Sequence, residues 1–122
     1  YGGCFVSSTY TDIWLTHDLD PDRPLEGLAR AALSLHFNRS LDFRADYIVQ
    51  RIKKYAVDGV VIHSCRSCKP WFIGSYDLKD MIAAQTGVPT LIFDGDQIDP
   101  RFLSDDQMYS RIDAFMETLV KA

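Results

Sequence analysis

The densest group of reactive side chains lies in residues 63–71, which read His-Ser-Cys-Arg-Ser-Cys-Lys-Pro-Trp. Cys65 and Cys68 stand in C-x-x-C spacing. Thiolate is the reactive and metal-binding form of cysteine, and the neighbouring Arg66, Lys69 and backbone N–H groups favour that form. The spacing alone leaves three interpretations open: a zinc or iron–sulfur half-site, a dithiol redox pair, and two incidental loop cysteines.

A second polar segment covers residues 94–101, Asp-Gly-Asp-Gln-Ile-Asp-Pro-Arg. Its three carboxylates could bind a cation, but Asp, Gly and Pro in this order are more typical of a turn in which side chains cap backbone groups. We therefore favour the turn. Arg101 either pairs with one of these acids or faces a phosphate.

The three histidines are scattered along the chain. His17 and His36 are interpreted as ordinary surface or core residues. His63 adjoins the cysteine segment and is a candidate for lining the site.

The apolar pattern alternates between short strand-like runs and longer helical stretches. Val60-Val61-Ile62 is a continuous β-branched run, as expected of a strand buried on both faces of a parallel sheet. In the helix predicted next to it, Arg44 is expected at the surface. Strands are predicted at residues 2–7, 60–62 and 88–93, helices at 24–32, 42–55, 76–86 and from 104 onward, and a loop at 63–74.

This alternation predicts an α/β fold: a three-layer, Rossmann/flavodoxin-like domain with a mainly parallel sheet. In such folds ligands bind at the carboxyl ends of the strands. Both polar segments follow predicted strands, so the sequence predicts a site where residues 63–74 and 94–101 meet.

The chain has 122 residues, of which 47% are hydrophobic and 25% charged, which suits one compact α/β domain over residues 1–122. The net charge of −4 argues against general nucleic-acid binding. No apolar run approaches the roughly 20 residues of a membrane span. Three cysteines without a secretory signal indicate a reducing, cytoplasmic compartment. Because the chain begins Tyr1-Gly2-Gly3, we expect it to be a fragment of a longer protein.

Several stretches resemble the 2-hydroxyacyl-CoA dehydratase family, and in particular its larger type of subunit. Residues 58–71, ending in Arg-Ser-Cys-Lys-Pro-Trp, resemble the family's third cysteine motif. Residues 87–90, 94–96 and 99–101 are similar to its next strand and turn. The closing helix is similar at residues 111–115, and an earlier, less specific likeness lies at 24–29.

This resemblance implies a heterodimer with one [4Fe–4S] cluster per subunit, each held by three cysteines of that subunit. Cys68 matches the third ligand, and the other two belong to a preceding domain, so these residues are the C-terminal cluster-binding part. Cys65 and Cys4 match no ligand position. The side chains expected to line the cluster or substrate are His63, Ser64, Cys65, Arg66 and Ser67.

The resemblance also implies the reaction, in which (R)-2-hydroxyacyl-CoA loses water to give 2-enoyl-CoA. An ATP-dependent iron–sulfur activator protein delivers one electron at low potential under anaerobic conditions. The thioester becomes a ketyl radical that expels the 2-hydroxyl group, and the β-hydrogen then becomes acidic. The cofactor carries this chemistry while the protein binds, orients and shields. The resemblance assigns no general base.

Three other functions remain open. Benzoyl-CoA reductase subunits belong to the same superfamily and use related clusters. A C-x-x-C redox or electron-transfer module needs both thiols, whereas a dehydratase site built on Cys68 tolerates Cys65→Ser. A non-enzymatic α/β binding domain needs neither.

Overall fold

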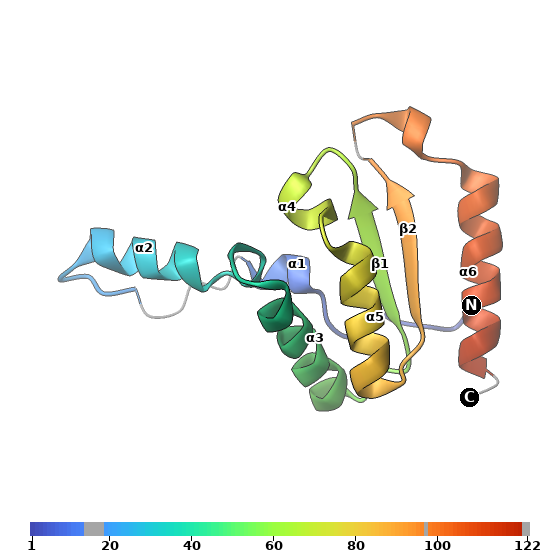
Figure 1. The fold of residues 1–122 in the computed structure, drawn as a ribbon, viewed down its shortest axis with the longest axis horizontal. Helices are drawn as coiled ribbons and strands as arrows, with labels where there is room; N and C mark the ends of the chain where they lie inside the picture. Colours follow the sequence, from blue (N-terminus) through green and yellow to red (C-terminus); the bar gives the residue numbers. More distant parts are fainter. Residues whose placement is uncertain (14–18, 97, 121–122) are drawn as a thin grey trace.

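The computed structural model describes residues 1–13, 19–96 and 98–120 (Figure 1). It is a mixed α/β structure, as predicted from the alternating apolar pattern. Its elements are α1 (Thr9–Asp12), α2 (Pro24–Ser34), η1 (His36–Asn38), α3 (Leu41–Tyr55), β1 (Val60–Cys65), α4 (Lys69–Phe72), α5 (Ser75–Thr86), β2 (Thr90–Gly95), η2 (Pro100–Phe102) and α6 (Asp105–Val120).

The sheet of the described residues consists of β1 and β2, which run parallel. The register pairs Val60 with Thr90 at one end and Cys65 with Gly95 at the other. Helices α4 and α5 form the crossover between the two strands, as a parallel pair requires. The carboxyl ends of both strands therefore lie at the same edge, together with α4 and η2 (Figure 1).

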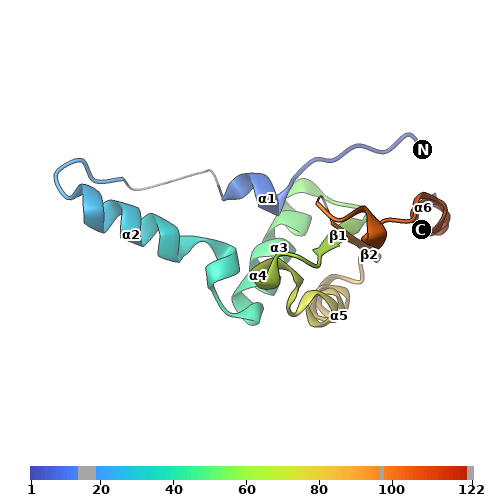
Figure 2. The same ribbon diagram turned by 90° about the horizontal axis from the view of Figure 1, so that it is seen from above.

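Helices cover both faces of this sheet. Viewed from above, α3 and α5 lie on one side of the strands and α6 lies on the other (Figure 2). This layering agrees with the predicted three-layer α/β architecture. Gly59 permits the close approach of α6, because a Cβ atom at this position would lie 2.7 Å from the Phe115 ring and 2.9 Å from a Leu119 methyl group.

The hydrophobic core lies between α3, α5 and the sheet. Four side chains form its buried centre: Ala45, Ile52, Leu78 and Ile82. The periodicity that predicted these helices follows from this packing, since residues three and four apart share one helix face. Ser40 caps α3, and its Oγ accepts a hydrogen bond of 3.3 Å from the Phe43 N–H.

The strand predicted at residues 2–7 is wrong, because residues 1–8 form no regular element. They run beside α6, where the Tyr1 hydroxyl donates a hydrogen bond to Asp113 and Gly3 lies near Met116. A strand is stable only when a neighbour satisfies its backbone groups, and no other strand of the described residues lies there to pair with it.

The loop predicted at residues 63–74 is also partly wrong. Residues 63–65 continue β1, and Lys69–Phe72 form the short helix α4. Pro70 does not prevent this helix, because proline lies in its first turn, where the missing N–H has no intrahelical partner. The second strand begins two residues later than predicted, since Pro89 lacks an N–H, although its carbonyl accepts the Val60 N–H at 2.9 Å.

Helix α2 extends away from the sheet and forms an arm (Figures 1 and 2). Its Leu25, Leu28 and Leu33 side chains are 82%, 56% and 68% exposed. The arm is therefore an apolar surface that the rest of the described chain does not cover. None of the helices in the described ranges is both long enough and apolar enough to cross a membrane.

Candidate functional site

Cys68 lies in a tight turn directly after β1. Its N–H donates to the carbonyl of Cys65, the last residue of the strand, at 3.1 Å. Its own carbonyl accepts the Phe72 N–H at 2.9 Å, so Cys68 is the N-cap residue of α4. Cys68 is exposed, whereas Cys65 is half-buried with its Sγ 3.5 Å from the Ser67 Oγ. The turn thus presents Cys68 outward and directs Cys65 toward a neighbouring hydroxyl group.

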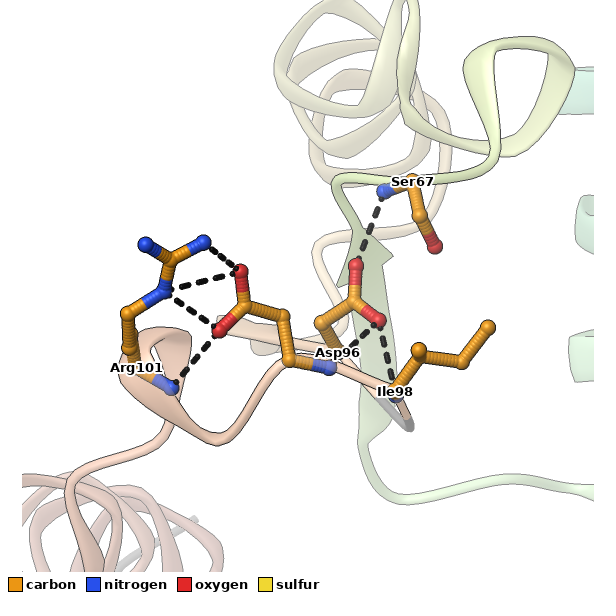
Figure 3. Close-up of polar contacts among 5 residues, drawn as sticks. Ser67, Asp96, Ile98 and Arg101 are labelled. Carbon is orange, nitrogen blue, oxygen red and sulfur yellow. Dashed lines mark hydrogen bonds and ion pairs between the residues drawn. The ribbon is translucent and has the colours of Figure 1, made fainter.

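Asp96 anchors this turn from the segment after β2 (Figure 3). Its Oδ2 accepts the Ser67 N–H at 3.1 Å, and its Oδ1 accepts the N–H groups of Ile98 at 2.9 Å and Asp99 at 3.3 Å. These bonds, the Ile98 bond foremost, lower the pKa of Asp96. The carboxylate therefore ties together the two segments that the sequence placed at one edge of the sheet.

Asp99 and Arg101 form a second local pair in the same segment. Asp99 accepts the Arg101 N–H at 3.1 Å and its guanidinium Nε at 2.8 Å (Figure 3). The predicted capping of backbone N–H groups is confirmed for Asp96 and Asp99, whereas Asp94 and Gly95, which were predicted in the turn, belong to β2. Among the described residues, no three His, Cys, Asp or Glu side chains are grouped so as to hold a metal ion.

Arg66 and Asp94 form a third link between the two strand ends. The guanidinium lies 2.9 Å from the Asp94 carboxylate and also faces the rings of Phe72 and Phe102, at 5.8 Å and 5.7 Å. Burial raises the pKa of Asp94, but the hydrogen bond from Arg66, the nearby Ser64 hydroxyl and the positive charges of Arg66 and Arg111 outweigh it, so the pKa is lowered overall. Asp94 is thus held as a carboxylate.

Ser64 and His63 lie on opposite faces of β1, as neighbours in a strand do. Ser64 is fully buried, and neither its Oγ nor the Asp94 Oδ1 has a hydrogen-bond partner of good geometry. His63 is half-buried and stacks on Phe93 with ring centroids 5.3 Å apart. Gly95 makes room for it, because a Cβ there would lie 3.0 Å from the imidazole Nε2.

Of the predicted lining residues, the structure therefore gathers Cys65, Arg66, Ser67 and Cys68 on the surface turn. His63 and Ser64 lie in β1 just before that turn, His63 half-buried and Ser64 fully buried.

A cluster of aromatic rings packs around Trp71 of α4. The Trp71 ring meets those of Tyr10, His36 and Phe37 edge to face, with centroids 5.9–6.4 Å apart. His36 is buried, as one of the two alternatives for it required. His17 lies outside the described residues.

Arg44 is buried, so the predicted surface position of this residue is wrong. It is only 8% exposed, and its guanidinium donates to the carbonyl of Pro70 in α4 at 3.3 Å. Its Nε has no partner, and burial lowers its pKa. No local pattern could reveal this, because the contact joins residues 26 positions apart.

These residues fit a contribution of one ligand to an iron–sulfur cluster. Cys68 provides one exposed thiol on a turn fixed by Cys65, Asp96 and α4. A three-cysteine site that contains Cys68 but neither Cys65 nor Cys4 would require two further thiolates from outside this chain.

Comparison with known proteins gives a match over nearly the whole chain. The family described as 2-hydroxyglutaryl-CoA dehydratase, D-component, matches residues 1–119. The (R)-2-hydroxyisocaproyl-CoA dehydratase alpha subunit of Clostridioides difficile is 32% identical over 98% of this chain and 29% of its own length. The lactoyl-CoA dehydratase subunit alpha of Anaerotignum propionicum is 30% identical over 93% of this chain and 27% of its own length.

A third relative carries a different name. A benzoyl-CoA reductase subunit of Thauera aromatica is 28% identical over 95% of this chain and 28% of its own length. The chain thus spans less than a third of the length of each of these three relatives.

Proposed function

Because the chain belongs to the 2-hydroxyglutaryl-CoA dehydratase, D-component, family, we propose that it is part of a subunit that dehydrates (R)-2-hydroxyacyl-CoA to 2-enoyl-CoA. The names of two similar relatives, both alpha subunits of 2-hydroxyacyl-CoA dehydratases, support this substrate class. The proposed enzyme is a heterodimer that receives one electron from an ATP-dependent iron–sulfur activator protein.

The observation that carries the proposal is the exposed Cys68 thiol on its fixed turn. It lies at the carboxyl end of a parallel strand, where α/β folds bind ligands. We propose that Cys68 is one thiolate ligand of a [4Fe–4S] cluster whose other cysteines lie outside these residues. When bound, such a cluster supplies single electrons at low potential.

The residues around Cys68 fix the position of this proposed ligand. Asp96 fixes the backbone at Ser67, and α4 fixes the backbone after Cys68. Arg66 pairs with Asp94 beside the turn and so links the ends of β1 and β2. The Cys65–Ser67 contact leaves Cys65 as a neighbour of the ligand. Groups of this kind orient metal ligands and tune the metal, and their loss typically costs affinity about 10–100-fold.

Benzoyl-CoA reduction is a second candidate, which the likeness to the benzoyl-CoA reductase of Thauera aromatica favours. Both candidates need the cluster and a CoA thioester, so the ligand experiment does not separate them. Assays of the activated enzyme with 2-hydroxyacyl-CoA and with benzoyl-CoA do: an enoyl-CoA product identifies the dehydratase, and ring reduction identifies the reductase.

The decisive experiment measures iron and acid-labile sulfide in the intact subunit, purified anaerobically with its partner. We expect about four irons per wild-type subunit, as a [4Fe–4S] cluster requires, and their loss in Cys68→Ser. Cys65→Ser is the matched control, because it removes a thiol from the same turn without removing the proposed ligand. We expect it to retain the iron.

Two results would contradict the proposal. A Cys68→Ser subunit that keeps its full iron content would show that Cys68 is no ligand. A wild-type subunit without iron, whose activity is abolished equally by Cys65→Ser and Cys68→Ser, would indicate a dithiol redox module instead.

A further inference from the structure

A hollow of about 230 Å³ lies beside the Cys68 turn, between the end of β2, η2 and the first turns of α6. Three arginines from three parts of the chain line it: Arg66 after β1, Arg101 in η2 and Arg111 in α6. No single local motif brings these residues together. The fold itself gathers three guanidinium groups around one space.

The charges of this hollow are only partly compensated. Arg66 pairs with Asp94, and Arg101 pairs with Asp99. Arg111 forms no ion pair within the described chain, and its positive charge helps to lower the pKa of Asp94 from a distance. One guanidinium therefore remains available for an added anion, and Arg101, which is 85% exposed, can turn toward it.

The rest of the lining is mainly polar, although Phe93, Phe102 and Met108 also contribute to it. Ser104 and Gln107, at the beginning of α6, add hydroxyl and amide groups, and the first turn of that helix also carries Asp105 and Asp106. Guanidinium groups bind phosphate oxygens with two parallel hydrogen bonds.

We propose that this hollow binds a phosphate group of the coenzyme A carrier. The identity of the carrier rests on the proposed function, whereas the anion subsite rests on the three arginines. A phosphate ester presents terminal oxygens in several directions and so suits donors arriving from three elements. A carboxylate, which presents two oxygens in one plane, is met by a single guanidinium group.

The test titrates the intact subunit, complexed with its partner, with coenzyme A, 3′-dephospho-coenzyme A and pantetheine by calorimetry. We expect Arg111→Ala to weaken coenzyme A binding about tenfold, the effect of one lost charge-assisted hydrogen bond. Pantetheine, which has no phosphate, should bind both proteins equally. Arg111→Lys keeps the charge and should recover part of the affinity.

The three ligands also separate the phosphates. If Arg111→Ala weakens coenzyme A but not the dephospho form, the hollow holds the 3′-phosphate. If both weaken equally, it holds the pyrophosphate. Lys53→Ala is the matched control, because it removes an exposed positive charge from α3, away from the hollow, and should change no affinity.

Three outcomes would overturn the proposal: wild-type protein that does not bind coenzyme A, an Arg111→Ala variant with unchanged affinity for it, or an equal loss with pantetheine. Arg111 is exposed on a helix, so its alanine variant should fold and keep its iron. Iron content is measured separately, so failure of the proposed function is distinguishable from failure of this inference.

Discussion

His36 illustrates how a single buried residue makes stability depend on pH. It is 5% exposed, its ring stacks on Tyr47 with centroids 5.0 Å apart, and its Nε2 has no hydrogen-bond partner. Burial lowers its pKa below the usual 6.5, and the nearby Arg44 and Arg51 lower it further, while Asp12 opposes them. The folded protein therefore resists protonating a group that the unfolded chain protonates readily.

The sign of the effect follows from proton linkage. Because the unfolded state binds the proton first, the contribution of His36 is present above about pH 6.5 and is lost as the pH falls below it. The loss is at most about 1.4 kcal/mol per pH unit for one proton. We expect His36→Phe, which keeps the aromatic contacts, to remove this part of the dependence.

Urea unfolding of wild type and His36→Phe between about pH 8 and pH 5 measures the difference. The comparison cancels the contributions of the other titrating groups. Equal slopes of unfolding free energy against pH would show that His36 binds its proton equally readily in the folded and unfolded states.

At the scale of the elements, α3 and α5 end in the same left-handed backbone conformation with different residues. Ala56 follows α3 with φ 48°, and Gly87 follows α5 with φ 69°. Glycine adopts this conformation freely, whereas a Cβ atom makes it cost roughly 1–2 kcal/mol. The two caps therefore predict stability changes of opposite sign.

We expect Ala56→Gly to raise the free energy of unfolding by about 1 kcal/mol and Gly87→Ala to lower it by about 1 kcal/mol. Nothing lies within 4 Å of a Cβ at Gly87, so the second change tests the backbone alone. Denaturant melts of both variants provide the measurement. A destabilised Ala56→Gly would mean that the Ala56 methyl group contributes packing that outweighs the strain.

The elements also show what the sequence can and cannot reveal. Helices α3 and α5 are predicted to within one residue at each end, because their apolar periodicity is local. The strand expected at residues 2–7 fails because strand formation depends on a distant partner. Helix α4 is missed because Pro70, taken locally, favours a loop.

The candidate site divides in the same way. Its position at the strand ends and the exposed Cys68 turn follow from residue types and their order. The links that fix it do not, since Asp96 to Ser67, Arg66 to Asp94 and Arg44 to Pro70 each join residues 26 to 29 positions apart. The sequence assigns Arg111 to the closing helix but not to the site, because only the packing of α6 brings it to the hollow.

At the scale of the whole molecule, the protruding α2 arm should govern how this chain behaves in solution. Leu25, Leu28 and Leu33 are exposed on it, and exposed apolar surface of this kind promotes association. We expect the triple change of these leucines to Gln to reduce self-association of the 122-residue chain. Thermal stability should hardly change, because the core of α3, α5 and the sheet does not include them.

Light scattering after size-exclusion chromatography, together with a thermal melt, tests this expectation. The control is a second triple variant, with the same number of changes, away from the arm. It replaces three exposed residues of α3 with Ala: Asp46, Gln50 and Lys53. If the leucine changes lower the melting temperature, the arm packs against the rest of the chain in solution.

Asp96 binds the main-chain N–H of residue 67, and this has a consequence for sequence variation across the site. Every amino acid except proline carries that N–H, so this contact imposes almost no restriction on position 67. Position 96 is restricted severely, because the same side chain must also reach two further N–H groups. A saturation scan should therefore find that proline is the one residue rejected at position 67 because of this contact. At position 96 it should find that few residues other than aspartate are accepted, although this position lies 28 residues away from Cys68, whose geometry it preserves.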